Sequence, residues 1–286
     1  MYCLSYDSGK REKTGRRMMV RFLSRCFLTL VLLLTAYPFV WMLLASFKSN
    51  QQIYKPDQLI PTSFDPFAFR ILFSNDLFLF NEVLIRSILL SSGQALFACV
   101  VTAAAGYAIA KGNFRGRKLV FGAAVLLILF PKQAMSLFLF EWMSVLGLTG
   151  DVYGFLLSGV ASGLGVVFFT QVFRKVPTEL VDLSLLEGQS HTGCFLSLLP
   201  LMIPALITYG IIHFLLSWQE HLLPLLVLGN DQLTLPLALA KLSDSSYRVP
   251  EAVGLAAGVL AMIPMLFLFG FFFRRIRTAL ADWVVS

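Results

Sequence analysis

The chain has 286 residues, of which 57% are hydrophobic and 14% are charged, and its mean hydropathy is +0.77. Because an average soluble domain carries about 25% charged residues, this composition excludes an ordinary globular enzyme. The net charge of +7 does not indicate nucleic-acid binding, since the basic residues are dispersed at the edges of apolar segments and do not gather on one face. We therefore expect membrane lipid, and no nucleic acid, among the partners of the protein.

Six segments are long and apolar enough to cross a bilayer as helices. A spanning helix needs about 20 mainly apolar residues, because every backbone polar group must be bonded internally. Five of the six segments contain no Asp, Glu, Lys or Arg, and the third carries Lys132 directly after Pro131. The first segment is longer than the core of a signal peptide and no Ala-x-Ala cleavage site follows it, so we expect it to be retained. The sequence predicts an all-α polytopic protein with spans at 26–47, 87–110, 119–140, 152–172, 193–217 and 252–273.

The distribution of basic residues predicts the orientation of these spans. If both termini are cytoplasmic, the inside segments hold 16 of the 23 Lys and Arg residues and the outside segments hold six. Because Lys and Arg are hard to translocate, we expect both termini on the cytoplasmic side. Two outside stretches, 48–86 and 218–251, are then long enough to form small folded caps that an extracytoplasmic partner can meet. The expected parts are a basic N-terminal segment at 1–25, the six-span domain at 26–273 with a cytoplasmic loop at 173–192, and a C-terminal tail at 274–286.

The cytoplasmic loop has the pattern of two short helices lying against the inner membrane surface. Pro177 and Thr178 suit the start of the first helix, and acidic residues in its first turn favour the positive end of the helix dipole. Gly188 suits a C-terminal cap that needs a positive φ angle. After a break, Thr192 is expected to cap the second helix.

One face of the first predicted helix combines apolar and acidic residues. Leu180, Leu183 and Glu187 share this face by three- and four-residue spacing, with Val181 and Leu185 alongside. An interfacial helix that lies on lipid usually carries Lys and Arg on its polar face, whereas this helix carries three acids. The pattern favours protein docking over membrane association.

Motifs for catalysis and metal binding are missing from the sequence. The one Gly-Lys pair, Gly9-Lys10, lacks both the first glycine and the hydroxyl residue of a P-loop, so the chain is not expected to bind ATP in that way. There is no His-Glu-x-x-His, no Gly-x-Ser-x-Gly and no Cys-x-x-Cys sequence, and the three histidines have no ligand spacing. We expect a protein that is not an enzyme, with no catalytic residues, no metal and no cofactor.

The loop and the segment after it resemble a known family, the inner-membrane permease subunits of binding-protein-dependent ABC importers. The resemblance is to the carbohydrate-uptake class, related to the maltose and glycerol-3-phosphate systems. Its signature is Pro-x-Glu-Leu-x-Glu-Ala-Ala-x-x-Asp-Gly-Ala, followed by Phe-x-x-Ile-x-Leu-Pro-Leu-x-x-Pro. Leu183 and Ser184 replace the two alanines, while Asp182 and Glu187 stand for other acids of the signature. The matching residues are Pro177, Glu179, Leu180, Gly188, Leu199, Pro200, Leu201 and Pro204, with Phe195 one residue after the position of the signature's Phe, and similar segments extend over residues 37–240.

This resemblance implies a transport function in the bacterial inner membrane. The fold would be that of a type I ABC importer permease, and the chain would form half of the pathway for a sugar or related polar solute. The implied partners are a homologous second permease subunit, a cytoplasmic ABC ATPase dimer that binds the ATP, and an extracytoplasmic solute-binding protein. The residues implied in coupling to the ATPase are Glu179, Leu180, Asp182, Leu183, Ser184, Glu187 and Gly188.

Three residues are candidates for lining the pathway. Lys132 is the one formal charge inside a predicted span, where it costs on the order of 2.5 to 3.5 kcal/mol. It either lines a pathway or, if the third span is shifted, extends toward an interface. Trp218 and Glu220 place an aromatic ring beside a carboxylate, which suits sugar binding, although Trp218 also fits an interface belt and Glu220 a pair with a neighbour.

Two other functions remain open from the residues alone. An ion-coupled secondary transporter would need intramembrane acids or broken-helix repeats, and no Asp or Glu lies within the six predicted segments. A membrane scaffold or assembly factor without conduction is the second alternative.

Overall fold

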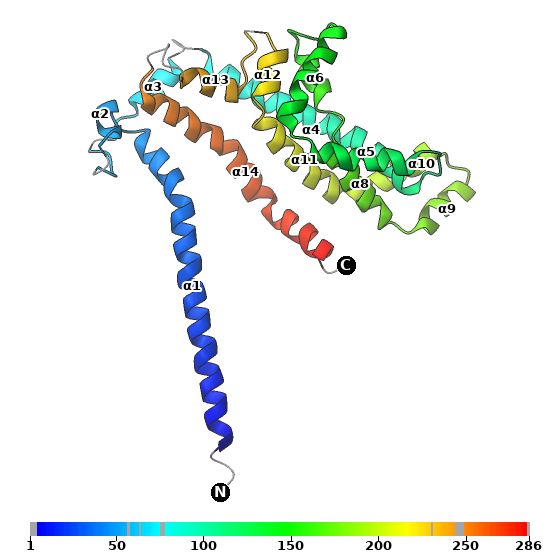
Figure 1. The fold of residues 1–286 in the computed structure, drawn as a ribbon, viewed down its shortest axis with the longest axis horizontal. Coiled ribbons are helices and arrows are strands. Elements are labelled where there is room, and N and C mark those ends of the chain that lie inside the picture. Colours follow the sequence, from blue (N-terminus) through cyan, green and yellow to red (C-terminus); the bar gives the residue numbers. More distant parts are fainter. Residues whose placement is uncertain are drawn as a thin grey trace. The chain divides into compact units, whose positions relative to one another are not determined.

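The structure is a computed structural model in which the chain folds as helices joined by turns. The predicted segments at 1–25 and 274–286 lie partly outside the described residues. The basic side chains of these segments that come before residue 18 or after residue 272 are not described. Within the described part of the chain no strand is present, which confirms the all-α class (Figure 1). The described residues are 5–55, 58–62, 64–74, 78–229, 231–243 and 249–284.

The chain divides into two compact units, of which the first contains residues 1–71 and 250–259. It begins with the 41-residue helix α1 (Ser5–Ala45), followed by α2 (Asn50–Ile53). Lys48 is 4% exposed and its ammonium donates a hydrogen bond to the carbonyl oxygen of Gln58, because a buried charge needs a polar partner. The Tyr54 hydroxyl donates to the carboxylate of Glu251, the first residue of α14 (Glu251–Val284). These two bonds fix the segment after α1.

The second unit contains residues 72–249 and 260–286, and the long helix α4 (Phe80–Lys111) is its central element. It packs along α8 (Gly163–Arg174) and α11 (Ile203–Trp218), as Figure 1 shows. The approach to α8 is close because Gly106 faces it: a Cβ added there would lie 2.6 Å from the Cβ of Phe169 and 2.8 Å from the backbone nitrogen of Thr170. Small residues allow such helix contacts in membrane proteins.

Two of the six predicted spans each consist of two helices that meet at a bend. The predicted span at 119–140 consists of α5 (Arg117–Leu129) and α6 (Lys132–Val145), which meet at 114°. Pro131 causes this break, since it offers no backbone N–H, and it forces the residue before it out of the helical region. Phe130 accordingly has φ −79° and ψ 131°.

The second broken span is the one predicted at 152–172. It consists of α7 (Val152–Ser158) and α8, which meet at 48°. Ser162 begins α8 by accepting a hydrogen bond from the backbone N–H of Gly165 at 3.4 Å, as helix-capping serines do.

The remaining predicted spans correspond to single apolar helices or to helices that continue one another. Helix α10 (His191–Leu198), the 3₁₀ turn η1 (Leu199–Met202) and α11 form one continuous stretch. Four such stretches and the two bent pairs coincide with the six predicted segments, which confirms a polytopic membrane protein with four to six spans. The stretches outside the spans contain α2, α3 (Phe67–Phe73), α12 (Leu222–Val227) and α13 (Leu235–Leu242).

Candidate functional site

The predicted cytoplasmic loop contains the short helix α9 (Thr178–Leu186), which begins and ends where the sequence predicts. Pro177 precedes it in an extended conformation, with φ −55° and ψ 136°. At its end, the backbone N–H groups of residues 187, 188 and 189 donate to carbonyls of the last turn at 3.0 Å each. Gly188 has φ +86°, a conformation that glycine adopts without the steric cost of a Cβ. The predicted glycine cap is confirmed.

The cap of the next helix differs from the prediction. Ser190, and not Thr192, precedes α10, and its hydroxyl accepts a hydrogen bond from the backbone N–H of Gly193 at 3.2 Å. Thr192 lies one residue inside the helix. The cap therefore comes two residues earlier, because the turn that follows Gly188 is short.

The inner face of α9 is anchored in the hydrophobic core of the second unit. Val181 is 4% exposed, and Leu185 packs against the same cluster, which includes Tyr107, Phe173 and Cys194. The Ser184 hydroxyl donates back to the carbonyl oxygen of Leu180 at 2.9 Å, so it is satisfied within the helix. These contacts hold α9 against α4, α8 and α10.

The opposite side of α9 is an exposed surface that we call the α9 outer face. Its apolar residues Leu180, Leu183 and Leu186 are 45%, 56% and 85% exposed. Sequence reasoning missed Leu186, although its three-residue spacing from Leu183 was a signal for it. Apolar side chains between carboxylates form a surface suited to a protein partner with apolar pockets and basic groups. The acids of the α9 outer face, all exposed, are Glu179, Asp182 and Glu187.

A second group of predicted residues lies where α6 meets the end of α11. The Lys132 ammonium is 3.2 Å from a carboxylate oxygen of Glu220, and the two side chains are 43% and 8% exposed. Lys132 is the first residue of α6, directly after the break, and therefore does not lie in the middle of a straight span. The structure brings together two of the three pathway candidates. It pairs Glu220 with a neighbour, one of the two possibilities that the sequence left open.

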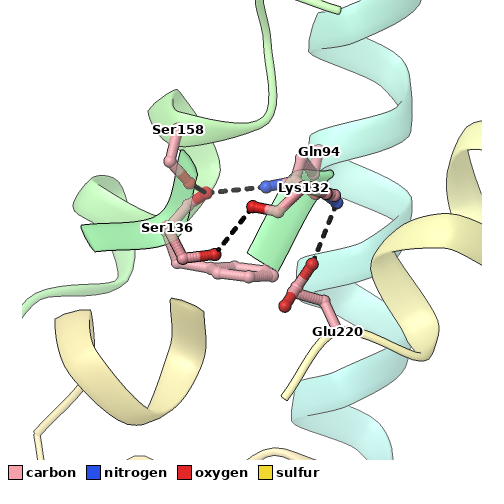
Figure 2. Close-up of polar contacts among 6 residues, drawn as sticks. Gln94, Lys132, Ser136, Ser158 and Glu220 are labelled. Atoms are coloured by element: carbon pink, nitrogen blue, oxygen red, sulfur yellow. Dashed lines mark hydrogen bonds and ion pairs between the residues drawn. The ribbon is translucent and has the colours of Figure 1, made fainter. Parts of the chain in front are cut away.

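Further polar contacts surround this ion pair (Figure 2). The amide of Gln94, on α4, donates to the carbonyl oxygen of Phe155 at 2.7 Å, and the hydroxyl of Ser158 donates to the same oxygen at 2.6 Å. The buried hydroxyl of Ser136 donates to the carbonyl oxygen of Lys132 at 3.1 Å. Figure 2 shows these side chains converging from α4, α6 and α7. Sequence analysis missed Gln94, because a single amide in an apolar run gives no periodic signal.

The third pathway candidate, Trp218, is packed inside the protein. It is 4% exposed and stacks on Phe214 with the ring centroids 5.5 Å apart. Helix α11 also carries buried polar residues four positions apart. Among them, the hydroxyl of Tyr209 lies 3.2 Å from Nδ1 of His213. The predicted role of Lys132, Trp218 and Glu220 in a pathway stays a prediction.

A large apolar cavity lies elsewhere in the second unit. Its volume is about 890 Å³, and α4, α10, α11 and the second half of α14 line it. Phe214, Phe267 and Pro264 are among the lining residues. Such walls offer a polar solute almost no hydrogen bonds, so this cavity alone is no solute site.

Comparison with known proteins identifies the family. Residues 101–285 match the model of the family described as the binding-protein-dependent transport system inner membrane component. The chain belongs to this family. The permease is therefore a multi-pass protein of the inner membrane, and the matched region includes α8, α9 and α11.

Relatives of the permease are transport proteins with similar lengths. The arabinooligosaccharides transport system permease protein AraQ of Halalkalibacterium halodurans is 30% identical over 249 residues, which cover 84% of this chain and 88% of that protein. The trehalose transport system permease protein SugB of Mycobacterium tuberculosis is 30% identical over 263 residues, covering 90% and 95% of the two chains.

A solved structure has the same fold. It is the crystal structure of a bacterial ABC transporter involved in the import of the acidic polysaccharide alginate, with a TM-score of 0.78. At 17% sequence identity the match covers 90% of this permease and 96% of that chain.

Proposed function

We propose that the permease forms half of the translocation pathway of an ATP-driven importer for a sugar or a related polar solute. The names of the relatives support a sugar, since they include transporters of arabinooligosaccharides, trehalose and lactose. The other half of the pathway comes from a homologous second permease subunit. Because the sequence has no P-loop, ATP binds to a separate ABC ATPase dimer.

The α9 outer face is the observation that carries this proposal. Leu180, Leu183 and Leu186 are exposed on a helix whose other side is fixed in the core by Val181. An ATPase that binds this face and then changes conformation would displace α9 as a rigid body. Because Val181 and Leu185 of α9 lie in a core cluster with Tyr107 of α4 and Phe173 of α8, that displacement reaches the membrane helices.

The proposed orientation places both termini and the loop at 173–192 in the cytoplasm. The excess of Lys and Arg on that side supports this orientation. The segments that contain α2, α3, α12 and α13 then face the outside, where a solute-binding protein delivers the solute.

The test is ATP hydrolysis by the assembled transporter. The permease is purified together with its ATPase and second permease subunit, placed in lipid vesicles, and assayed with and without the solute-loaded binding protein. We expect the loaded binding protein to stimulate ATP hydrolysis. A wild-type permease that binds no ABC ATPase would overturn the proposal. A rate of ATP hydrolysis that is the same with and without the loaded binding protein would also overturn it.

A charge placed on the α9 outer face should break the contact with the ATPase. Leu183→Arg is expected to weaken ATPase association about tenfold or more, as disruption of a central apolar contact does at interfaces. The amount of ATPase that co-purifies with the permease measures this effect. Gln189→Arg adds the same charge to the same loop outside α9 and should leave association unchanged. Equal association of Leu183→Arg and wild type would contradict the proposed docking face.

A further inference from the structure

The cytoplasmic end of α4 contacts the segments on both sides of α9. Tyr107 and Lys111 lie four residues apart on α4 and therefore share one face of that helix. The Tyr107 ring meets Phe173 of α8 edge-on, with centroids 5.4 Å apart, and lies 5.4 Å from the ring of Phe195 of α10. α4 is thereby fixed to the helix before α9 and to the helix after it.

Lys111 binds the connection between α8 and α9 directly. Its ammonium donates a hydrogen bond of 2.5 Å to the carbonyl oxygen of Val176. Val176 is 9% exposed and stands directly before Pro177, where α9 begins. Hydrogen bonds from a charged donor are about twice as strong as neutral ones. This bond therefore holds the start of α9 to the end of α4.

Acidic residues of α9 add to the same contact. Glu179 and Asp182 lie close enough to Lys111 to attract its positive charge. The ammonium is half-buried, so water screens this attraction less than at an open surface. Lys111 thus binds a carbonyl oxygen directly before α9 and is attracted at longer range by two carboxylates of that helix.

We propose that Lys111 is a positioning residue that fixes α9 to α4, so that a displacement of α9 moves the membrane helices. This inference rests on the proposed function, in which an ATPase displaces α9. Val181 and Leu185 hold the middle of α9 in the core independently of Lys111. Loss of the Lys111 bond therefore leaves α9 folded and able to dock. The connection at 174–177 can then bend when the ATPase displaces α9.

The experiment measures coupling in the complete transporter in lipid vesicles. We compare solute transported per ATP hydrolysed for the wild type and for Lys111→Met, Lys111→Arg and Lys111→Glu. Lys118→Met is the matched control, because Lys118 is an exposed lysine in the first turn of α5, near Lys111 in the chain. Amide hydrogen exchange across residues 178–188 is measured on the same complexes, since a looser start of α9 should exchange faster.

The proposal predicts separate effects on docking and coupling. Lys111→Met should keep ATPase association within about twofold of wild type but transport about tenfold less solute per ATP, in line with loss of one charged hydrogen bond. Lys111→Arg keeps the charge and the donors and should restore coupling. Lys111→Glu should be worse than Lys111→Met, because its carboxylate faces Glu179 and Asp182. Lys118→Met should match wild type.

Two results would overturn the proposal. One is an unchanged ratio of solute to ATP in Lys111→Met, and the other is an equal loss in Lys111→Arg and Lys111→Met. If Lys111→Met does not reach the membrane, Lys111→Gln, a shorter neutral donor, is measured by the same two criteria. The proposed function fails separately, through a wild-type permease that binds no ATPase.

Discussion

Gly188 ends α9 in a backbone conformation that side chains rarely adopt. At φ +86° an added Cβ meets no neighbouring atom within 4 Å, so the constraint lies in the backbone and not in the packing. The sequence predicted this residue because a glycine after a short helical pattern is a recognised stop signal. The cap determines the direction in which the chain leaves the α9 outer face.

Replacement of Gly188 by a β-branched residue should therefore strain the loop. Gly188→Val is expected to cost about 1 to 2 kcal/mol and to weaken ATPase association about tenfold, with normal membrane insertion. Gly188→Asn should be milder, because asparagine tolerates positive φ. Gly193→Ala is the matched control, since its added Cβ meets only ordinary contacts at 3.6 Å. Uptake at the wild-type rate by Gly188→Val would contradict the cap argument.

The ion pair of Lys132 and Glu220 is expected to stabilise the fold. Because the Glu220 side chain is 8% exposed, Lys132→Met leaves an almost buried carboxylate without its partner. We expect a loss of about 1 to 2 kcal/mol in the free energy of unfolding, measured by thermal unfolding in detergent, and partial recovery in Lys132→Met/Glu220→Gln.

An exposed pair provides the control for that measurement. Arg70 and Asp65 are 2.5 Å apart with side chains 71% and 55% exposed, so Asp65→Asn should change stability by less than about 0.5 kcal/mol. Equal effects of Lys132→Met and Asp65→Asn would mean that the Lys132 pair has no structural role.

Among the elements, the sequence indicated a kink at Pro131 but gave neither its angle nor the second break, between α7 and α8. Pro131 indicated a kink in the third span, but hydropathy detects only the apolar run and could not predict that α5 and α6 meet at 114°. The sequence also left the pairing of Lys132 with Glu220 open, because Lys132 lies directly after the break between α5 and α6. Gly188 and the bounds of α9 were predictable, because caps and short amphipathic helices are set by neighbouring residues.

The close contact of α4 and α8 is testable at a single glycine. Gly106→Ala places a Cβ 2.6 Å from Phe169 and 2.8 Å from the backbone of Thr170, so the two helices must separate. We expect a loss of about 1 to 3 kcal/mol in stability, seen as a lower melting temperature in detergent. Gly122→Ala, in α5, meets no atom within 4 Å and should be neutral or stabilise slightly. A melting temperature of Gly106→Ala equal to that of wild type would contradict this packing.

For the whole molecule, composition and span length were enough to predict a polytopic membrane protein, and the signature in residues 177–204 predicted the family of importer permeases. The solute pathway was harder to predict from the sequence, because in the proposed assembly residues of two permease subunits would form it together. Trp218 illustrates this, since its sequence context suits a sugar but its ring is packed on Phe214. The α9 outer face was easier to predict, because it belongs to one short segment of one chain; its role in coupling stays a prediction.

The most direct test of the proposed docking of α9 on an ATPase is a photo-crosslinking residue placed at Leu183 of the permease in the complete transporter. A second crosslinker at Tyr54, exposed in the segment proposed to lie outside, serves as the comparison. We expect an adduct with the ATPase from Leu183 and none from Tyr54. An adduct of Leu183 with the extracytoplasmic binding protein, or no ATPase adduct from Leu183 in a transporter that hydrolyses ATP, would contradict the proposed docking.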